Sequence, residues 1–488
     1  MMSNSKQVSN NKDGMEPFFN CIGVYGDTTA LITEDSEQIS YRGLLLKAND
    51  IKKHLNERSL VFCICGNDVE SIAGYIGFLR GGIVPVLINA GINKELLQNL
   101  LRTYLPQHIW LPGSMAGDFS DCKHVYHYRN YLLLRTSFTA NYSLHDDLAL
   151  LLTTSGSTGS PKLVRQSYKN IISNANSIAE YLSIIAADRS ITTMPMSYSY
   201  GLSIINSHLL KGASIVLTKK TLMEKKFWQL LKEYEVTTFG GVPYVYEMLK
   251  KLRFSRMELP NLRMLTQAGG KLGAELSAEF ATICRDKGIR FFVMYGQTEA
   301  TARMSYLPPE YGISKAGSIG IAIPGGEFWL EDKNGNAITQ SDTAGELIFK
   351  GDNVTMGYAQ DYSELCKSDE NNGILKTGDI AKRDDDGFYY IVGRRKRFLK
   401  LFGNRVNLDE VERLLITAGY ECACAGSDDN MIIFVTSQNN HEEINRYIIE
   451  NTGINQAGVS LVYIPKIPRN DSGKILYSDL SCSGGGFV

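Results

Sequence analysis

The chain has 488 residues, more than one ordinary hydrophobic core accommodates, so two or more domains are expected. Its 51 Lys and Arg balance 52 Asp and Glu, which argues against a nucleic-acid partner or a polybasic membrane protein. Hydrophobic residues at 43% and charged residues at 21% are ordinary for a soluble globular protein.

The ends and the cysteines indicate a cytoplasmic protein. Residues 1–17 are polar and lack the apolar stretch of a secretory signal. No run of about 18 apolar residues occurs, so no membrane span is expected. The nine cysteines lie mostly in apolar segments such as 61–65, which predicts buried free thiols in a reducing compartment rather than metal ligands.

Strand-like and helix-like patterns alternate from about residue 60 to residue 300. The apolar run Leu148–Thr153 predicts a buried strand, and apolar residues at helical spacing from Ile171 to Leu182 predict a helix. Further strands are expected at Ile191–Met194, Ile215–Leu217, Val236–Phe239, Met264–Thr266 and Phe291–Met294. This alternation predicts an α/β fold with a mostly parallel sheet flanked by helices.

The pattern changes after Ala316, where alternating strands and Asn-Gly and Asp-Gly turns predict a β-rich subdomain at about 317–394. The basic run Arg394–Arg397 then separates an apolar strand from a new unit. We expect a large N-terminal domain at 1–394, a hinge at 395–397 and a small mobile α+β domain at 398–488.

A Gly/Ser/Thr loop follows the strand that ends at Thr153 and precedes the helix from Ile171. Its glycines allow a close backbone approach, its hydroxyls and amides donate hydrogen bonds, and its lysine adds a positive charge. Together these properties suit a polyphosphate, although the loop is not a Walker A sequence. The phosphate-binding candidates are Thr154, Ser155, Gly156, Ser157, Thr158, Gly159 and Lys162.

The loop T-S-G-S-T-G-S-P-K resembles the phosphate loop of the adenylate-forming superfamily, which contains acyl-CoA synthetases, peptide-synthetase adenylation domains and luciferases. Further motifs follow in that family's order: Y-G-Q-T-E at 295–299, T-G-D at 377–379, G-R at 393–394 and P-R-N-D-S-G-K at 468–474. The resemblance covers about residues 27–480.

The resemblance implies roles for the residues of these motifs. Tyr295 stacks on adenine, with Gly296 and Gln297 beside it; Thr298 contacts the phosphates; Glu299 helps to hold Mg²⁺; Asp379 accepts the ribose hydroxyls; and Arg394 contacts the nucleotide. A flat ring suits a base, and an ionised carboxylate suits a hard cation or two vicinal hydroxyls. Gly270 and Lys271 are also expected on the nucleotide side.

The resemblance also implies two half-reactions of an acid–thiol ligase. A carboxylic acid attacks MgATP to give acyl-AMP and pyrophosphate, with Lys474, Glu299 and Thr158 as catalytic residues. The small domain then rotates about Lys396, and the loop at Gly403 forms the channel for a thiol, either CoA or the phosphopantetheine of a separate acyl carrier protein.

The acyl side of the expected site departs from the family pattern. Tyr198 stands where many acyl-CoA synthetases have His, and no carboxylate occupies the position that pairs with an α-ammonium in amino-acid-activating members. Candidate substrate contacts are Tyr198, Tyr200, Gly201, Val242 and Gly269, with Arg303 and Tyr306 nearby. The two tyrosines favour a small or hydroxylated acid as substrate. An equal alternative is that both tyrosines pack in the core and do not contact the substrate.

Two other functions remain open at this point. One is an amino-acid adenylation enzyme of the D-alanine ligase type. The other is a non-catalytic nucleotide-binding protein, against which Lys474, Glu299 and Asp379 argue.

Overall fold

The computed structural model describes residues 18–480, apart from 56, 140, 154–161, 395–396, 402–403, 428–429, 438–439, 453, 455, 471–472 and 474. The described residues form two compact units, and each is presented by itself. The first unit contains 18–153, 162–238 and 355–370, and the second contains 239–354 and 371–480. The expected domain boundary at 395–397 remains a prediction, because 395 and 396 lie outside the described residues.

The first unit is built on an eight-stranded sheet with strands in the order β19, β9, β8, β4, β3, β5, β7, β6. Its central strands β8, β4, β3 and β5 run parallel, and every residue of β3 is buried, as expected for a parallel strand covered on both faces. The bounds are β3 (Leu60–Cys65), β4 (Val84–Asn89), β5 (His108–Pro112), β6 (Lys123–Tyr128), β7 (Tyr131–Arg135), β8 (Leu148–Thr153), β9 (Leu163–Ser167) and β19 (Tyr358–Ala359). The buried strand predicted at Leu148–Thr153 is therefore confirmed.

Shorter strands of the first unit pair in the order β10, β11, β1, β2. They are β1 (Thr29–Ile32), β2 (Gln38–Ser40), β10 (Arg189–Ile191) and β11 (Ser214–Val216). The strand expected at Ile191–Met194 was misplaced: β10 ends at Ile191, and residues 192–194 belong to no strand. The longer helices are α2 (Tyr41–Lys52), α3 (Val69–Gly81), α4 (Lys94–Tyr104), α5 (Tyr168–Tyr181), α6 (Ser199–Leu210) and α7 (Lys225–Glu233), with the short α1 (Phe18–Cys21) before them.

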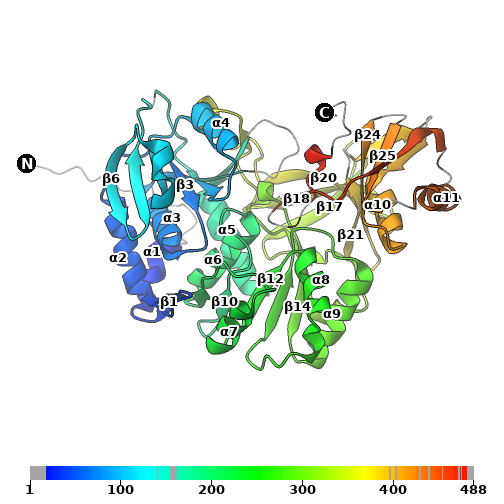
Figure 1. Ribbon diagram of the computed structural model, residues 1–488, viewed down its shortest axis with the longest axis horizontal. Helices are drawn as coiled ribbons and strands as arrows, with labels where there is room; N and C mark the ends of the chain where they lie inside the picture. Colours follow the sequence, from blue (N-terminus) through cyan, green and yellow to red (C-terminus); the bar gives the residue numbers. More distant parts are fainter. Residues whose placement is uncertain are drawn as a thin grey trace, which may run out of the picture. The chain divides into compact units, whose positions relative to one another are not determined.

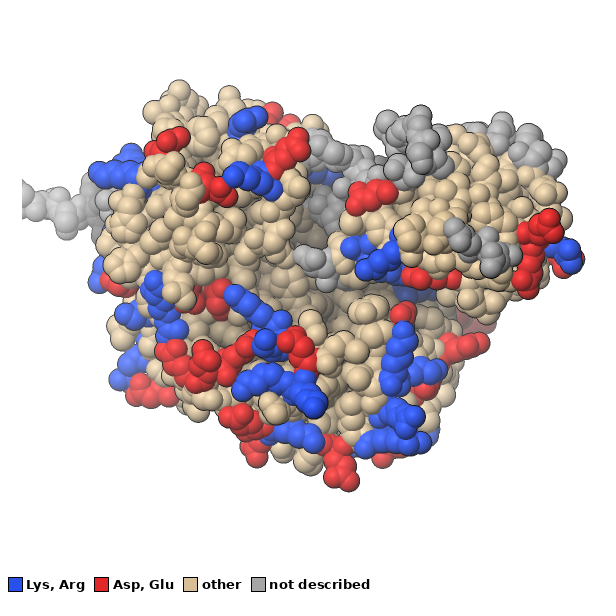
Figure 2. All heavy atoms as spheres, viewed as in Figure 1, with Lys and Arg blue, Asp and Glu red and all other residues tan. Residues whose placement is uncertain are grey.

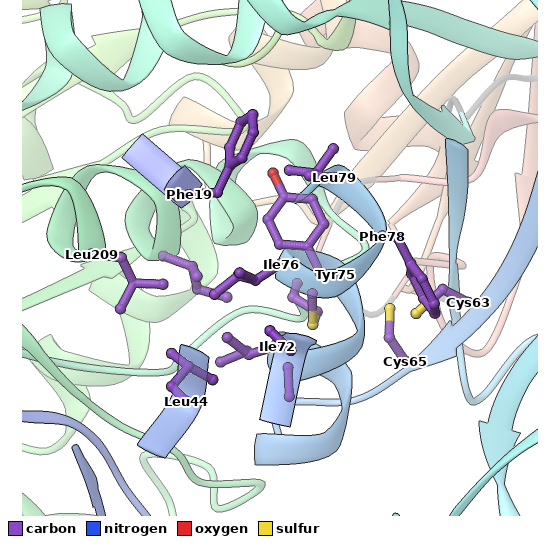
Figure 3. Packing of buried hydrophobic residues seen from close by; sticks show 14 of the residues in the cluster. Phe19, Leu44, Cys63, Cys65, Ile72, Tyr75, Ile76, Phe78, Leu79 and Leu209 are labelled. Carbon is purple, nitrogen blue, oxygen red and sulfur yellow. The ribbon is translucent and has the colours of Figure 1, made fainter. Parts of the chain in front are cut away.

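Helix α3 lies at the centre of the main core of the first unit. Its Ile72, Tyr75 and Ile76 pack with Leu44 of α2 and Leu209 of α6 (Figure 3). Helices α2 and α3 approach so closely that a Cβ at Gly77 would lie 2.5 Å from the Ala48 carbonyl oxygen. Each fully buried aliphatic side chain contributes about 1.5–3 kcal/mol to folding. The first unit is thus a layered α/β structure, as the sequence predicted.

The second unit continues the α/β pattern and then changes to antiparallel sheet. Strand β13 runs parallel to β14, whereas β15 and β16 add antiparallel. The elements are α8 (Pro243–Lys251), α9 (Ala274–Asp286), β13 (Met264–Gln267), β14 (Arg290–Tyr295), β15 (Ser305–Leu307) and β16 (Ile321–Ala322), preceded by β12 (Thr238–Gly241), whose first residue belongs to the first unit.

The predicted β-rich segment is confirmed as a four-stranded antiparallel sheet in the order β17, β18, β20, β21. Its strands are β17 (Gly326–Glu331), β18 (Gly345–Gly351), β20 (Ile374–Arg383) and β21 (Tyr389–Arg394). Lys315 closes its β20–β21 turn with an ion pair of 2.9 Å to Asp384, while its ammonium also contacts Asp386. Strand β19 lies between β18 and β20 in the sequence, but it belongs to the first unit.

The C-terminal residues form α+β structure, coloured orange to red in Figure 1. A hairpin of β22 and β23 precedes α10, and β24, β25 and β26 form a three-stranded sheet. Their bounds are β22 (Phe398–Leu401), β23 (Asn404–Asn407), α10 (Leu408–Thr417), β24 (Cys422–Ser427), β25 (Asn430–Val435), α11 (His441–Thr452) and β26 (Val459–Tyr463). The helices and strands of this region agree with the α+β character that the sequence predicts for it.

Charges of both signs are interspersed on the face shown in Figure 2, as the balanced composition suggests. Exposed pairs such as Lys250–Glu279 contribute little to stability, because water and salt screen them. Across the part of the chain that the structure describes, no helix has the length and apolarity that crossing a membrane requires.

Candidate nucleotide and acyl site

The nucleotide-side candidates of the second unit gather around the carboxylate of Asp379. Tyr295 Oη donates a hydrogen bond of 2.5 Å to Asp379 Oδ2, and Gln297 Nε2 donates one of 2.9 Å to the same oxygen. Arg394 Nε lies 2.9 Å from the other oxygen, Oδ1. Asp379 is 2% exposed, so its charge depends on these donors. Four residues from three separate motifs are thus brought to one point.

The Thr-Gly-Asp motif forms a bulge in β20. Ile348 of β18 pairs with Lys376, but Glu346 pairs with Ile380, so three residues of β20 face one residue of its neighbour. Thr377 Oγ1 fills the gap by donating to the Leu347 carbonyl oxygen at 2.7 Å, and Gly378 adopts a positive φ of 71°. A bulge re-aims side chains locally, and this one presents Asp379 to Tyr295.

Burial, followed by the Asp379 carboxylate, raises the pKa of Tyr295 well above its ordinary value. The phenol is therefore a permanent donor near neutral pH. The Asp379 charge also raises the pKa of Arg394, whose side chain is 61% exposed and thus partly screened by solvent. The cluster fixes the hydroxyl end of the Tyr295 ring, and an aromatic ring face is a surface on which a base can stack.

The turn after Tyr295 requires Gly296, because a Cβ there would lie 1.8 Å from the Ala302 carbonyl oxygen. Glu299 is half-buried in the following turn η4 (Thr298–Ala300). A single carboxylate suits Mg²⁺, which prefers to keep waters and phosphate oxygens as its other ligands. Among the residues that the structure describes, no three His, Cys, Asp or Glu side chains form a metal-binding group.

Sequence reasoning missed Asn353, which lies just after the end of β18 and holds this turn. Its buried amide donates to the carbonyl oxygens of Ala300 at 2.9 Å and Arg303 at 3.1 Å. Thr301 in turn donates to the Asn353 carbonyl oxygen at 2.8 Å and holds a positive φ of 64°, a strained conformation for a β-branched residue. No sequence motif marks Asn353, because its partners are backbone atoms far away in the chain.

Gly269, Gly270 and Lys271 form the turn after β13. Gly269 has a φ of 85°, and Gln267 Nε2 holds the Gly270 carbonyl oxygen at 2.9 Å. Lys271 is exposed and its ammonium donates to the Ile391 carbonyl oxygen at 2.8 Å. The lysine therefore reaches β21 of the same unit, three residues before Arg394.

The acyl-side candidates Tyr198, Tyr200 and Gly201 lie at the start of α6 in the first unit. The two rings meet edge to face with centroids 6.4 Å apart; Tyr200 is buried and Tyr198 half-buried. Gly201 is required, since a Cβ would lie 2.3 Å from the Pro195 carbonyl oxygen. Burial raises the pKa of Tyr198, so its hydroxyl stays protonated.

A second residue that sequence reasoning did not assign here is Asn67. Its amide donates to the Met194 carbonyl oxygen at 3.0 Å and accepts from the Met196 amide nitrogen at 3.1 Å. It therefore fixes the turn that leads into Tyr198.

In the second unit, Val242 is buried at the start of α8. A Cβ on Gly473 would lie 3.5 Å from Val242 Cγ2 and 3.4 Å from Tyr244 Cβ. Arg303 is 2% exposed and Tyr306 half-buried, both in this unit. The other expected site residues lie outside the described part of the chain: 154–159, Lys396, Gly403 and Lys474. Of the phosphate loop, the structure describes Lys162.

The profile of the AMP-binding enzyme family matches residues 18–359. The chain belongs to this family, and the prediction of an adenylate-forming ligase is confirmed.

Relatives and solved structures agree with this assignment. The 2-succinylbenzoate–CoA ligase of Bacillus licheniformis is 31% identical over 346 residues, which cover 68% of this chain and 70% of that protein. The enzyme of the same name from Bacillus pumilus is 28% identical over 94% of this chain and 96% of its own length. O-succinylbenzoate coenzyme A synthetase from Bacillus subtilis, solved with AMP, has a TM-score of 0.77 at 22% identity and covers 97% and 100% of the two chains, which supports the fold.

Proposed function

We propose that this enzyme activates a carboxylic acid with MgATP to acyl-AMP and pyrophosphate, and then transfers the acyl group to the thiol of CoA. The observation that carries the proposal is the cluster of Tyr295, Gln297 and Arg394 around the buried Asp379 carboxylate. An adenosine fits this arrangement, because the ring offers a stacking face and the carboxylate accepts hydrogen bonds from ribose hydroxyls.

The first half-reaction joins two anions, so its main requirement is positive charge at the α-phosphate. We assign this role to Lys474, with Thr158 and the rest of 154–159 binding the phosphates and Glu299 holding Mg²⁺. Bound Mg²⁺ supplies further charge neutralisation on the phosphate oxygens. The proximity of Gly473 to Val242 supports this role: a Cβ at Gly473 would lie 3.5 Å from Val242 Cγ2, so the residue before Lys474 lies near an acyl-side candidate.

The second half-reaction needs Lys474 to leave and a thiol to arrive. We propose that the C-terminal residues rotate about Lys396 and bring the loop at Gly403 to the acyl-AMP. CoA is preferred over a carrier protein because the relatives at 31% and 28% identity are both named CoA ligases.

The relatives' acid, 2-succinylbenzoate, is the first candidate substrate. The phenol of Tyr198 and the guanidinium of Arg303 favour an acid with a second polar group over a long alkyl chain. A free amino acid is disfavoured, because the start of α6 offers Ser199 and Tyr200 rather than a carboxylate to an α-ammonium.

The test is pyrophosphate release with ATP and a panel of acids: 2-succinylbenzoate, hydroxylated benzoates, short dicarboxylates, fatty acids and amino acids. Mass spectrometry of the product with CoA, and separately with a phosphopantetheinylated carrier protein, identifies the acceptor. An acid-dependent release followed by an acyl-CoA is expected. Release with amino acids alone, or no acyl-AMP with any acid, would contradict the proposal.

A further inference from the structure

Lys162, the described end of the expected phosphate loop, lies over an aromatic ring. Its ammonium nitrogen is 3.7 Å from the centroid of the Tyr358 ring, well within the distance of about 6 Å over which cation–π attraction acts. Both residues are half-buried and belong to the first unit. The lysine expected to meet the polyphosphate is therefore already held by a specific partner.

Tyr358 reaches Lys162 through backbone pairing of β19 with β9, the strand that directly follows the phosphate loop. Tyr358 pairs with Val164, and Ala359 pairs with Leu163, in antiparallel register. Tyr104 Oη further donates to the Ala359 carbonyl oxygen at 2.7 Å. The ring is thus carried by β19, and the lysine directly precedes the neighbouring strand β9.

Arg165, three residues after Lys162, fixes the backbone on both sides of Tyr358. Its side chain is fully buried and donates to the carbonyl oxygens of Tyr358 at 3.0 Å and Met356 at 2.8 Å. The same guanidinium donates to Glu370 Oε2 at 2.5 Å. Because the guanidinium is a planar fork, donors to several fixed acceptors leave β19 little freedom to shift.

Gly357 makes this arrangement possible. It has a φ of 108°, and a Cβ there would lie 2.7 Å from Glu370 Oε2 and 3.2 Å from Arg165 Nη2. The positive φ, together with the close approach of Arg165, favours glycine at this position. Arg165 therefore holds segment 355–370 through several hydrogen bonds, and these bonds fix the backbone that carries the Tyr358 ring.

We propose that Tyr358 is a positioning residue for Lys162, and that its ring face holds the ammonium in place for the β- and γ-phosphates of ATP. The proposal rests on the proposed function. A free lysine side chain loses considerable rotamer freedom when a ligand orders it. An ammonium already held on a ring loses less, and its remaining N–H groups can still donate to phosphate oxygens, so polyphosphate binds more tightly.

The test compares Tyr358→Leu, which removes the ring, with Tyr358→Phe, which keeps the face and removes the hydroxyl. Binding of pyrophosphate and of AMP to the intact chain is measured by calorimetry, together with KM for ATP. Tyr358→Leu should weaken pyrophosphate binding and raise KM by about 3- to 10-fold, the range of one cation–π contact. Tyr358→Phe should stay within about 2-fold of the parent, and AMP binding, which involves no β- or γ-phosphate, should not change.

A double-mutant cycle with Lys162→Met separates positioning from a general effect on folding. If Tyr358 acts through Lys162, adding Tyr358→Leu to Lys162→Met should produce no further loss of pyrophosphate binding. An equal loss in both backgrounds, or a Tyr358→Phe variant as weak as Tyr358→Leu, would overturn the proposal. Tyr362→Leu, an exposed tyrosine in the same segment, is the matched control and should bind pyrophosphate as the parent does.

Pyrophosphate binding needs no carboxylic acid, so the cycle distinguishes the two proposals. A parent that binds pyrophosphate and shows the coupling, but forms no acyl-AMP with any acid, contradicts the proposed function and supports the positioning role. A parent that forms acyl-AMP without any coupling contradicts the positioning role alone.

Discussion

Asp379 and Arg394 face each other across the neighbouring strands β20 and β21, with Arg394 Nε 2.9 Å from Asp379 Oδ1. The other oxygen, Oδ2, accepts hydrogen bonds from both Tyr295 and Gln297. A carboxylate offers about four acceptor positions, so three are filled by protein donors. A ribose with two hydroxyl donors must therefore share the carboxylate with this cluster or displace one of its donors.

Asp379→Ala should weaken ATP binding, because it removes the acceptor of the ribose hydroxyls and leaves Arg394 without its partner. Loss of hydrogen bonds to a charged group costs about 1.5–3 kcal/mol, which corresponds to roughly a 10- to 100-fold rise in KM for ATP. Isotopic ATP–pyrophosphate exchange measures this rise. The control is Asp342→Ala, an exposed carboxylate paired with Lys382 in the same unit, which should behave as the parent does. An unchanged KM in Asp379→Ala would contradict the ribose role.

Lys474→Ala should abolish adenylate formation while ATP binding remains measurable, because the lysine neutralises charge in the transition state more than in the ground state. A loss of at least about 100-fold in the rate of pyrophosphate release is expected, as for other charge-stabilising groups. Thioester formation from synthetic acyl-AMP should persist. Lys466→Ala, an exposed lysine upstream in the same segment, is the control. Acyl-AMP formation at the parent rate in Lys474→Ala would refute the assignment.

Asn353→Ala should lower activity without contact with the nucleotide, because the Asn353 amide holds the carbonyl oxygens of Ala300 and Arg303 on either side of a strained turn. Loss of each of these buried hydrogen bonds costs about 0.5–1.5 kcal/mol, and the Ala300 carbonyl oxygen keeps the Ala302 amide as a donor. We expect a lower melting temperature together with a raised Mg²⁺ requirement, since Glu299 lies in that turn. Titration of pyrophosphate release with Mg²⁺ measures the second effect.

Asn336→Ala, an exposed turn residue bonded to Asp332, is the matched control for this experiment. A stability loss in Asn353→Ala with no change in the Mg²⁺ requirement would show that Asn353 does not position Glu299.

The sequence predicted the layered α/β fold, the β-rich segment and the α+β C-terminal region, because hydrophobic periodicity follows burial in long regular elements. The Tyr295, Asp379 and Arg394 motifs were found because their residue types and order resemble a known family. The roles of Asn353 and Asn67 and the contact of Tyr358 with Lys162 were not predicted. Each depends on backbone pairing between segments distant in sequence, and periodicity carries no information about which strands become neighbours.

The basic run Arg394–Arg397 is another place where the sequence did not reveal which distant side chains become neighbours. No partner of Arg397 was predicted from the sequence. In the structure Arg397 holds a network of mostly buried side chains: it donates to Asp409 at 2.5 Å and Glu412 at 2.6 Å and lies 3.9 Å from the Tyr477 ring centroid. Arg397→Met should destabilise the chain by about 3–5 kcal/mol, because it leaves the Glu412 charge buried without its partner. Urea unfolding followed by circular dichroism measures the change.

The control for Arg397 is Arg413→Met, whose partner Glu410 is exposed. It should cost less than about 1 kcal/mol, as surface ion pairs do. Equal midpoints for the two variants would contradict the network's role.

The turn between β20 and β21 predicts a pH-dependent stability. Burial alone would raise the pKa of Asp384, but hydrogen bonds from Lys315, Phe388 and Tyr390 lower it overall. The carboxylates of Asp386 and Asp384 in turn raise the pKa of Lys315. A carboxyl whose pKa is lowered by folding stabilises the protein above its unfolded pKa of about 3.9, and that contribution is lost as the pH falls through its folded value. A lysine whose pKa is raised by folding stabilises the protein at every pH below its ordinary pKa.

Lys315→Met should therefore lower the melting temperature near pH 7, and the difference from the parent should shrink as the pH approaches about 3. Differential scanning fluorimetry across this range measures it, with the exposed Lys333→Met as the control. A difference that stays constant from pH 7 to pH 3 would show that Lys315 stabilises the turn through its packing on Phe388, not through the charge of Asp384.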